Sequence, residues 1–174
     1  ELDSLSDIIS FGVAPSLLIY FWTLSDLNSL GWSVSMFFVV CAALRLARFT
    51  ADIYLAPKTI DKNTYFVGIP SPGAAGLSLL PIFLYIEFEY SFLRNAYFNL
   101  INVGLIGFLM ISKIPTFSLG KIVFSKKYIP WIILLSVIIC VSLISNIWLT
   151  LIIIGFLYVL SIVYTVVINL RKNH

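Results

Sequence analysis

Residues 128–170 read YIPWIILLSVIICVSLISNIWLTLIIIGFLYVLSIVYTVVINL, and this 43-residue stretch contains no Asp, Glu, Lys or Arg. A helix of about 20 apolar residues crosses the hydrocarbon core of a bilayer, so the stretch is long enough for two crossings. Ser145 and Asn146, near its middle, are typical of a turn. The alternating polarity of a membrane β-strand is missing here. The stretch therefore predicts two consecutive transmembrane helices.

Four more uncharged stretches, of 18 to 24 residues each, lie before this one, at residues 8–25, 27–44, 63–86 and 95–112. The composition agrees with a membrane protein, because 60% of the residues are hydrophobic and 11% are charged, against about 45–50% and 25% in soluble domains. We predict an all-α fold, a polytopic membrane helical bundle with six transmembrane helices. The spans are expected at about residues 8–24, 31–49, 72–88, 96–112, 130–147 and 148–170.

The basic residues predict how the bundle is oriented. If the chain crosses the bilayer six times, ten of its eleven Lys and Arg residues fall on one side and only Arg94 falls on the other. Cytoplasmic loops carry such an excess. We therefore expect an integral membrane protein, in the cell membrane or an endomembrane, with both termini in the cytoplasm. We also expect residues 1–174 to form a single membrane domain.

Several function classes lack support in the sequence. The basic residues are scattered between apolar runs and form no stripe, so we expect no nucleic-acid partner. The chain has no glycine-rich phosphate loop, no Ser/His/Asp set and no Cys/His zinc pattern, and its single histidine is His174. Candidate functional groups are therefore sought among the carboxylates and cations next to the predicted spans.

Two carboxylates stand in the opening stretch ELDSLSD, residues 1–7. Asp3 and Asp7 are four residues apart and so lie on one face of a helix, where they can hold a hard divalent cation. The alternative is structural, since acids near a helix N-terminus are stabilised by the helix dipole. Asp7 directly precedes an uncharged run, and an acid at membrane depth is costly without a partner or an ion. This position favours a functional role.

Two arginines, Arg45 and Arg48, lie three residues apart near the end of the second predicted span. They point in similar directions on a helix and would suit an anion. Two structural alternatives remain: both side chains extend to the membrane surface, or Arg48 pairs with Asp52.

The stretch IPSPGAA, residues 69–75, predicts a helix start with Ser71 as N-cap and Pro72 at the first helical position. A helix N-terminus in a polar pocket would also suit a phosphate. Lys113 follows the fourth span and is either a topology charge or a phosphate contact.

Three stretches, in order along the chain, resemble one family. They are ELDSLSDIISFGVAP (residues 1–15), AALRLARF (42–49) and YFVGIPSPGAA (65–75), followed by the weaker MISK (110–113). The family is the CDP-alcohol phosphatidyltransferases, with the signature D-x2-D-G-x2-A-R-x8-G-x3-D-x3-D, and the similar branch is the phosphatidylserine synthases. Asp3 and Asp7 match the last two aspartates of that signature.

The first half of the signature has no counterpart in the chain. The resemblance implies about eight spans, so we expect two more helices and the remaining carboxylates to precede residue 1. The chain is thus expected to be an N-terminally truncated phosphatidyltransferase domain.

The resemblance implies an enzyme of phospholipid biosynthesis. It would transfer a phosphatidyl group from CDP-diacylglycerol, or a CDP-linked archaeal lipid, to L-serine, releasing CMP and depending on Mg²⁺ or Mn²⁺. Carried over by position, Asp3 and Asp7 would be metal ligands, and Asp7 would also act in catalysis as the general base. Substrate binding would fall to Arg45, Arg48 and Lys113. Family analogy also implies a homodimer among membrane lipids.

Two alternatives remain open. One keeps the family but takes glycerol phosphate or inositol phosphate as the acceptor. The other is a non-enzymatic membrane bundle or transporter, which predicts that Asp3 and Asp7 lie at the surface and not at a polar cavity shared with Arg45 and Arg48.

Overall fold

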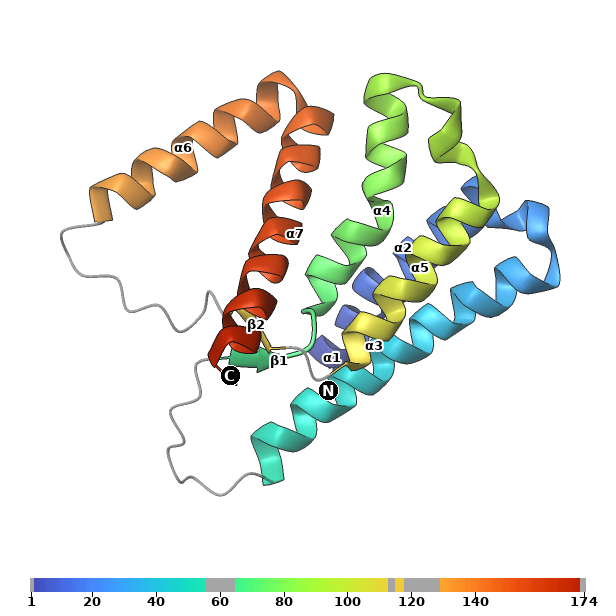
Figure 1. The fold of residues 1–174 in the computed structure, drawn as a ribbon, viewed down its shortest axis with the longest axis horizontal. Helices are drawn as coiled ribbons and strands as arrows, with labels where there is room; N and C mark the ends of the chain where they lie inside the picture. Colours follow the sequence, from blue (N-terminus) through green and yellow to red (C-terminus); the bar gives the residue numbers. More distant parts are fainter. Residues whose placement is uncertain (1, 56–64, 113–114, 118–128, 173–174) are drawn as a thin grey trace.

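The computed structural model describes residues 2–55, 65–112, 115–117 and 129–172. The described part of the chain is a bundle of apolar helices, which confirms the all-α membrane fold (Figure 1). The first span is one bent segment made of α1 (Leu2–Ile8), the π-helix η1 (Ile9–Val13) and α2 (Ala14–Trp22). The other long helices are α3 (Ser29–Leu55), α4 (Ser71–Phe88), α5 (Ala96–Ile111), α6 (Ile129–Ser145) and α7 (Ile147–Lys172).

Four of these six segments are long and apolar enough to cross a membrane, at Leu2–Trp22, Ser29–Ala51, Ser71–Phe88 and Ile147–Thr165. The apolar helices Ala96–Ile111 and Pro130–Ser145 are shorter. The connections between successive helices are brief on one side of the bundle, where they form the short 3-10 helices η2 (Leu24–Leu27) and η3 (Ser91–Arg94). The start of α1 and the end of α7 both lie at the opposite side (Figure 1).

The main differences from the sequence-based expectation are at the start of the first segment, which begins at Leu2 and not near residue 8, and at the ends of α3 and α6. The helix α3 continues to Leu55, six residues past the predicted end at Phe49, because a helix satisfies its own backbone groups and does not have to stop where the apolar run ends. The break between α6 and α7 falls at Asn146, so Ile147 begins α7 and does not end α6.

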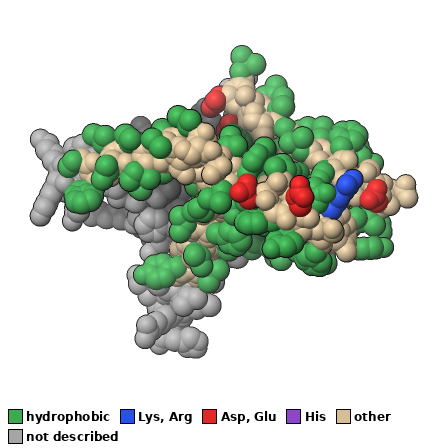
Figure 2. Space-filling view, turned by 90° about the horizontal axis from the view of Figure 1, so that it is seen from above, with side chains coloured by type: hydrophobic (Ala, Val, Ile, Leu, Met, Phe, Trp, Pro, Cys, Tyr) green, Lys and Arg blue, Asp and Glu red, His purple; other side chains and the backbone are tan. Residues whose placement is uncertain are grey.

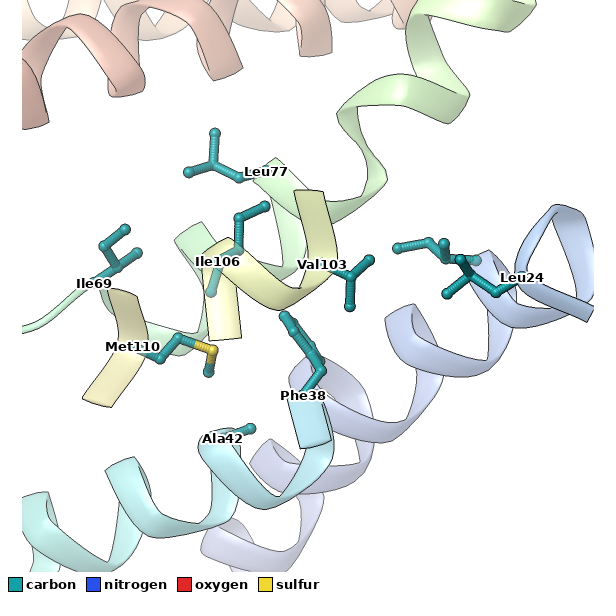
Figure 3. Packing of buried hydrophobic residues seen from close by; sticks show 10 residues of the cluster. Leu24, Phe38, Ala42, Ile69, Leu77, Val103, Ile106 and Met110 are labelled. Carbon is teal, nitrogen blue, oxygen red and sulfur yellow. The ribbon is translucent and has the colours of Figure 1, made fainter. Parts of the chain in front are cut away.

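The core lies between α2, α3, α4 and α5 (Figure 3). Its buried side chains include Ile19, Leu24, Phe38, Ala42, Ile69, Leu77, Val103, Ile106 and Met110. Within this region, the buried Ser16 donates a hydrogen bond from its Oγ to the Ser35 carbonyl over 2.8 Å. A hydroxyl in an apolar environment needs such a partner, so this bond fixes how α2 sits against α3.

The outer surface of the described helices is also largely apolar. Figure 2 shows a face that is largely hydrophobic, with charged side chains at intervals. Phe21 is 74% exposed and Ile144 is 87% exposed, and the side chains of residues 130–141 on α6 are all exposed. Exposed apolar surface on this scale is stable when lipid, and not water, covers it. The protein is therefore an integral membrane protein.

A small antiparallel sheet joins two connections at the end of the bundle that holds the termini. The strands β1 (Tyr65–Val67) and β2 (Pro115–Phe117) pair with Phe66 opposite Thr116. Gly68 follows β1 with φ of +82°, and a Cβ there would lie 2.6 Å from the Met110 carbonyl oxygen. The left-handed conformation and the close approach both require glycine. This turn brings the chain back to the start of α4.

Candidate active site

A cavity of about 210 Å³ lies where the first helical segment meets α3 and the start of α4. Its lining combines charged, hydroxyl and apolar side chains, namely Asp7, Phe11, Arg45, Leu46, Phe49, Pro70, Ser71 and Pro72. Elements far apart in the sequence therefore build one cavity, whose lining is mostly apolar but includes an acid, a cation and a hydroxyl. In Figure 1, α1 and the start of α4 lie at the same end of the bundle as the end of α7.

Asp7 lies in the last turn of α1, two residues before the π-helix η1. It is half-buried and lines the cavity, whereas Asp3, one turn earlier on the same helix, is exposed and is not part of the lining. Within η1, Gly12 is buried, and a Cβ on it would lie 3.1 Å from the Cβ of Ala42 on α3. A π-turn changes which side chains face a neighbouring helix, and such turns occur often at functional sites. Gly12 thus brings the segment after Asp7 close to α3.

Arg45 reaches the cavity from α3. Its Nη1 donates a hydrogen bond to Ser71 Oγ over 2.9 Å, while its Nε is buried without an acceptor in the described part of the chain. The prediction that Ser71 caps α4 is wrong. Pro70 is the N-cap, with no side-chain capping bond, and its carbonyl accepts from the Ala74 amide over 2.9 Å. Because Ser71 is already the first helical residue, its hydroxyl is available to Arg45.

Arg48 lies outside the cavity that Arg45 lines. Its side chain is exposed, it does not line the cavity, and its Nη1 donates to the Ile111 carbonyl over 3.1 Å. Ile111 ends α5, and the last carbonyls of a helix are free to accept hydrogen bonds and carry a partial negative charge. Arg48 therefore joins α3 to the end of α5. Lys113 and the side chain of Asp52 lie outside the described residues.

The structure thus brings two of the five predicted site residues together, Asp7 and Arg45, and adds Ser71 to them. The transporter alternative predicted that Asp3 and Asp7 both lie at the surface. Asp3 is exposed, as that alternative predicts, but Asp7 lines the cavity. Sequence reasoning missed Tyr158 of α7, whose buried hydroxyl lies against the start of α4, 2.7 Å from the position of a Cβ on Gly73. Its signal was weak, because nothing in the sequence separates it from Tyr128 and Tyr164 in the same apolar run.

Oxygen ligands for a hard cation are few here. Among the residues that the structure describes, no three His, Cys, Asp or Glu side chains form a group that could hold a metal ion. Asp3 and Asp7 share a helix face, but a Mg²⁺ or Ca²⁺ ion takes six or more oxygen ligands. The described residues alone therefore do not supply a full set of side-chain ligands for such an ion.

The side chains of the cavity indicate what kind of molecule it can bind. A carboxylate able to take a proton and a guanidinium able to bind an anion face one cavity in a bundle surrounded by apolar surface. Such a site suits chemistry on a molecule with a charged headgroup and a lipid tail, because the headgroup meets polar residues while the tail stays in the bilayer.

Comparisons with known proteins identify the relatives. The chain is 39% identical over 129 residues to the CDP-diacylglycerol–serine O-phosphatidyltransferase of Helicobacter pylori, covering 73% of this chain and 52% of the relative. The proteins of that name from Mycobacterium leprae and Saccharomyces cerevisiae are 35% identical over 115 residues and 42% identical over 84 residues. These matches cover 66% and 45% of this chain and 38% and 29% of the relatives.

No protein-family model matches the chain. The chain spans about half the length, or less, of these curated relatives. The shared sequence nonetheless confirms the resemblance to the phosphatidylserine synthase branch of the CDP-alcohol phosphatidyltransferases.

Proposed function

We propose that this chain is part of an enzyme that transfers the phosphatidyl group of CDP-diacylglycerol to L-serine and releases CMP. The observation that carries the proposal is the cavity shared by Asp7 and Arg45, in a chain similar to proteins named for that transfer. A transferase of this kind needs a group that accepts the proton of the attacking alcohol and a group that binds an anionic substrate. Asp7 and Arg45 are chemically suited to these two roles.

In the proposed reaction, the serine hydroxyl oxygen attacks the phosphorus that carries diacylglycerol. A new oxygen–phosphorus bond forms, the bond from that phosphorus to CMP breaks, and CMP leaves with the electron pair. The hydroxyl proton passes to the Asp7 carboxylate. Because a carboxylate is a far weaker base than an alkoxide, the proton moves as the new bond forms and not before it.

Arg45 is proposed to bind either the serine carboxylate or a lipid phosphate. A guanidinium presents a planar fork of donors that matches both groups. The bond from Arg45 to Ser71 uses one of these donors and restricts the side chain, so less conformational entropy is lost when the anion binds. The apolar residues Phe11, Leu46 and Phe49 line the same cavity and suit the lipid part of the substrate.

Arg48 and Lys113 are kept as proposed second contacts to the phosphates. The Arg48 guanidinium uses one nitrogen for the Ile111 carbonyl, which leaves its other donors for an anion. Lys113 follows Ser112 at the end of α5.

A divalent cation, Mg²⁺ or Mn²⁺, is proposed as the cofactor. Asp3 and Asp7 would hold it on their shared helix face, together with carboxylates from outside the described residues. When bound, the cation would neutralise the charge of the pyrophosphate. We further propose that the cavity faces the cytoplasm and that the protein is a homodimer; the first is supported by the distribution of basic residues, and the second by family resemblance alone.

The experiment that tests the proposal is an acceptor screen with the full-length protein in vesicles that contain CDP-diacylglycerol. CMP release is measured with L-serine, glycerol 3-phosphate or inositol phosphate added singly. We expect release with L-serine alone. Release with one of the phosphorylated acceptors and not with L-serine would assign the other acceptor, and no release with any of them would refute a transferase.

A further inference from the structure

Tyr158 is a polar residue in the helix α7 for which the reaction above has no use. Its hydroxyl is buried and finds no hydrogen-bond partner among the described residues. The same is true of the Nε of Arg45, and the two side chains lie within electrostatic range of each other. Buried polar atoms are nearly always paired, so two unpaired atoms of complementary chemistry near the start of α4 require an explanation.

The position of the Tyr158 ring is fixed by the start of α4. A Cβ on Gly73 would lie 2.7 Å from the Tyr158 Oη and 2.8 Å from its Cζ. These separations are too short for a real contact, so the ring occupies space that exists only because residue 73 is glycine. Gly73 is two residues after Ser71, which already holds Arg45 through its Nη1. The Tyr158 ring and the Arg45 guanidinium are therefore both held at the first turn of α4.

Two nitrogen atoms of the Arg45 guanidinium therefore have different environments. Nη1 is used by Ser71, and Nε carries a hydrogen with no acceptor in the described structure. A guanidinium binds a carboxylate or phosphate best through two parallel hydrogen bonds, which requires a fixed orientation of its plane. An acceptor on Nε would supply that orientation, and the Tyr158 oxygen, which is also unpaired among the described residues, is able to accept.

We propose that Tyr158 is a positioning residue for Arg45, whose Nε–H donates to the Tyr158 Oη when an anionic group of the substrate enters the cavity. The inference rests on the proposed function, because Arg45 is assigned there to the serine carboxylate or a lipid phosphate. Tyr158 does not line the cavity. Its effect on the substrate therefore passes through the orientation of Arg45.

The first test is Tyr158→Phe in the full-length protein, which keeps the ring against Gly73 and removes the acceptor. The KM for the substrate that Arg45 binds should rise about tenfold, as expected for one hydrogen bond to a charged group, while kcat changes by less than about twofold. A rise in the KM for L-serine assigns the carboxylate, and a rise in the KM for CDP-diacylglycerol assigns the phosphate. Tyr164→Phe, on an exposed tyrosine of the same helix, is the matched control and should change neither KM.

A second pair of variants tests the geometry. Gly73→Ala should move the Tyr158 ring and raise the same KM, whereas Gly76→Ala should not, because nothing lies within 4 Å of a Cβ at position 76. In an Arg45→Lys background, which lacks the Nε–H fork, Tyr158→Phe should add no further effect. Unchanged KM values in Tyr158→Phe, or effects of the two substitutions that simply multiply, would overturn the proposal.

A binding measurement separates this inference from the transferase proposal. Wild type and Tyr158→Phe are titrated calorimetrically in detergent micelles with L-serine and, separately, with CDP-diacylglycerol. Weaker binding of one ligand by Tyr158→Phe supports the positioning role even if no CMP is released. Equal affinities of the two proteins for both ligands would contradict it, whatever the outcome of the acceptor screen.

Discussion

The Nη1 of Arg45 donates a hydrogen bond to the Oγ of Ser71 over 2.9 Å, and this bond joins the middle of α3 to the first residue of α4. Both residues line the cavity that also contains Asp7. Three segments that are distant in the sequence therefore contribute to one polar site. The following predictions test how that site depends on each of them.

Replacing the cavity carboxylate should stop the proposed reaction. Asp7→Asn retains the shape of the side chain but cannot accept the serine proton, so CMP release should fall by at least about 100-fold, the usual contribution of a general base. Asp26→Asn is the matched control, because Asp26 is exposed in η2 and does not line the cavity. Near-normal turnover by Asp7→Asn would remove Asp7 from catalysis.

Chelation tests the proposed cation. EDTA should abolish CMP release, and Mg²⁺ or Mn²⁺ should restore it. Asp3→Asn should raise the cation concentration needed for half-maximal activity by at least about tenfold, since even changes beyond the direct ligands cost that much in metal affinity. Full activity in EDTA, or an unchanged cation requirement in Asp3→Asn, would argue against Asp3 as a ligand.

Removing the serine that holds Arg45 should weaken substrate binding more than folding. Ser71→Ala deletes the acceptor of Arg45 Nη1, so we expect a several-fold rise in KM and a loss of about 1 kcal/mol in the free energy of unfolding. Ser33→Ala removes an exposed hydroxyl that bonds only within its own helix, to the Ser29 carbonyl, and serves as the control. KM is measured from CMP release, and stability from denaturant titration in micelles. Equal KM values in the two variants would exclude a role for this bond.

The approach of η1 to α3 depends on Gly12. In Gly12→Ala, the new Cβ lies 3.1 Å from the Ala42 Cβ, so the two helices must separate slightly, and both stability and CMP release should decrease. The double variant Gly12→Ala/Ala42→Gly restores the space and should recover both properties. Gly104→Ala has nothing within 4 Å of its Cβ and should be neutral. A failure of the double variant to recover would mean that the close approach is not the cause.

The proposed orientation can be tested by labelling. With Cys41 and Cys140 replaced by alanine, single cysteines are introduced at the exposed positions Ser6 and Ser91, at opposite ends of the bundle. An impermeant maleimide should label Ser91→Cys in intact cells, and Ser6→Cys only after permeabilisation. The reverse pattern would place the cavity on the outer side.

The sequence by itself determined which segments of the chain form apolar helices. Charged residues are costly in hydrocarbon, so their absence from long runs marks the spans, and the six apolar segments follow those runs closely. The helical repeat also put Asp3 and Asp7 on one face, because four residues complete about one turn. The predicted start of the first segment and the predicted ends of α3 and α6 were less accurate. Hydropathy indicates which residues lipid can surround, and it does not indicate where the hydrogen bonds of the helix backbone stop.

The tertiary structure alone decided which polar groups meet. Arg45 and Arg48 looked equivalent in the sequence, yet Arg45 contacts Ser71 at the cavity and Arg48 contacts the end of α5. Tyr158 reaches the first turn of α4, where Ser71 holds Arg45, from a helix that looked purely apolar. The physical reason is that hydropathy fixes the depth of a residue in the bilayer, whereas its neighbours depend on how helices rotate and approach one another, which small residues such as Gly12 and Gly73 control through the space they leave.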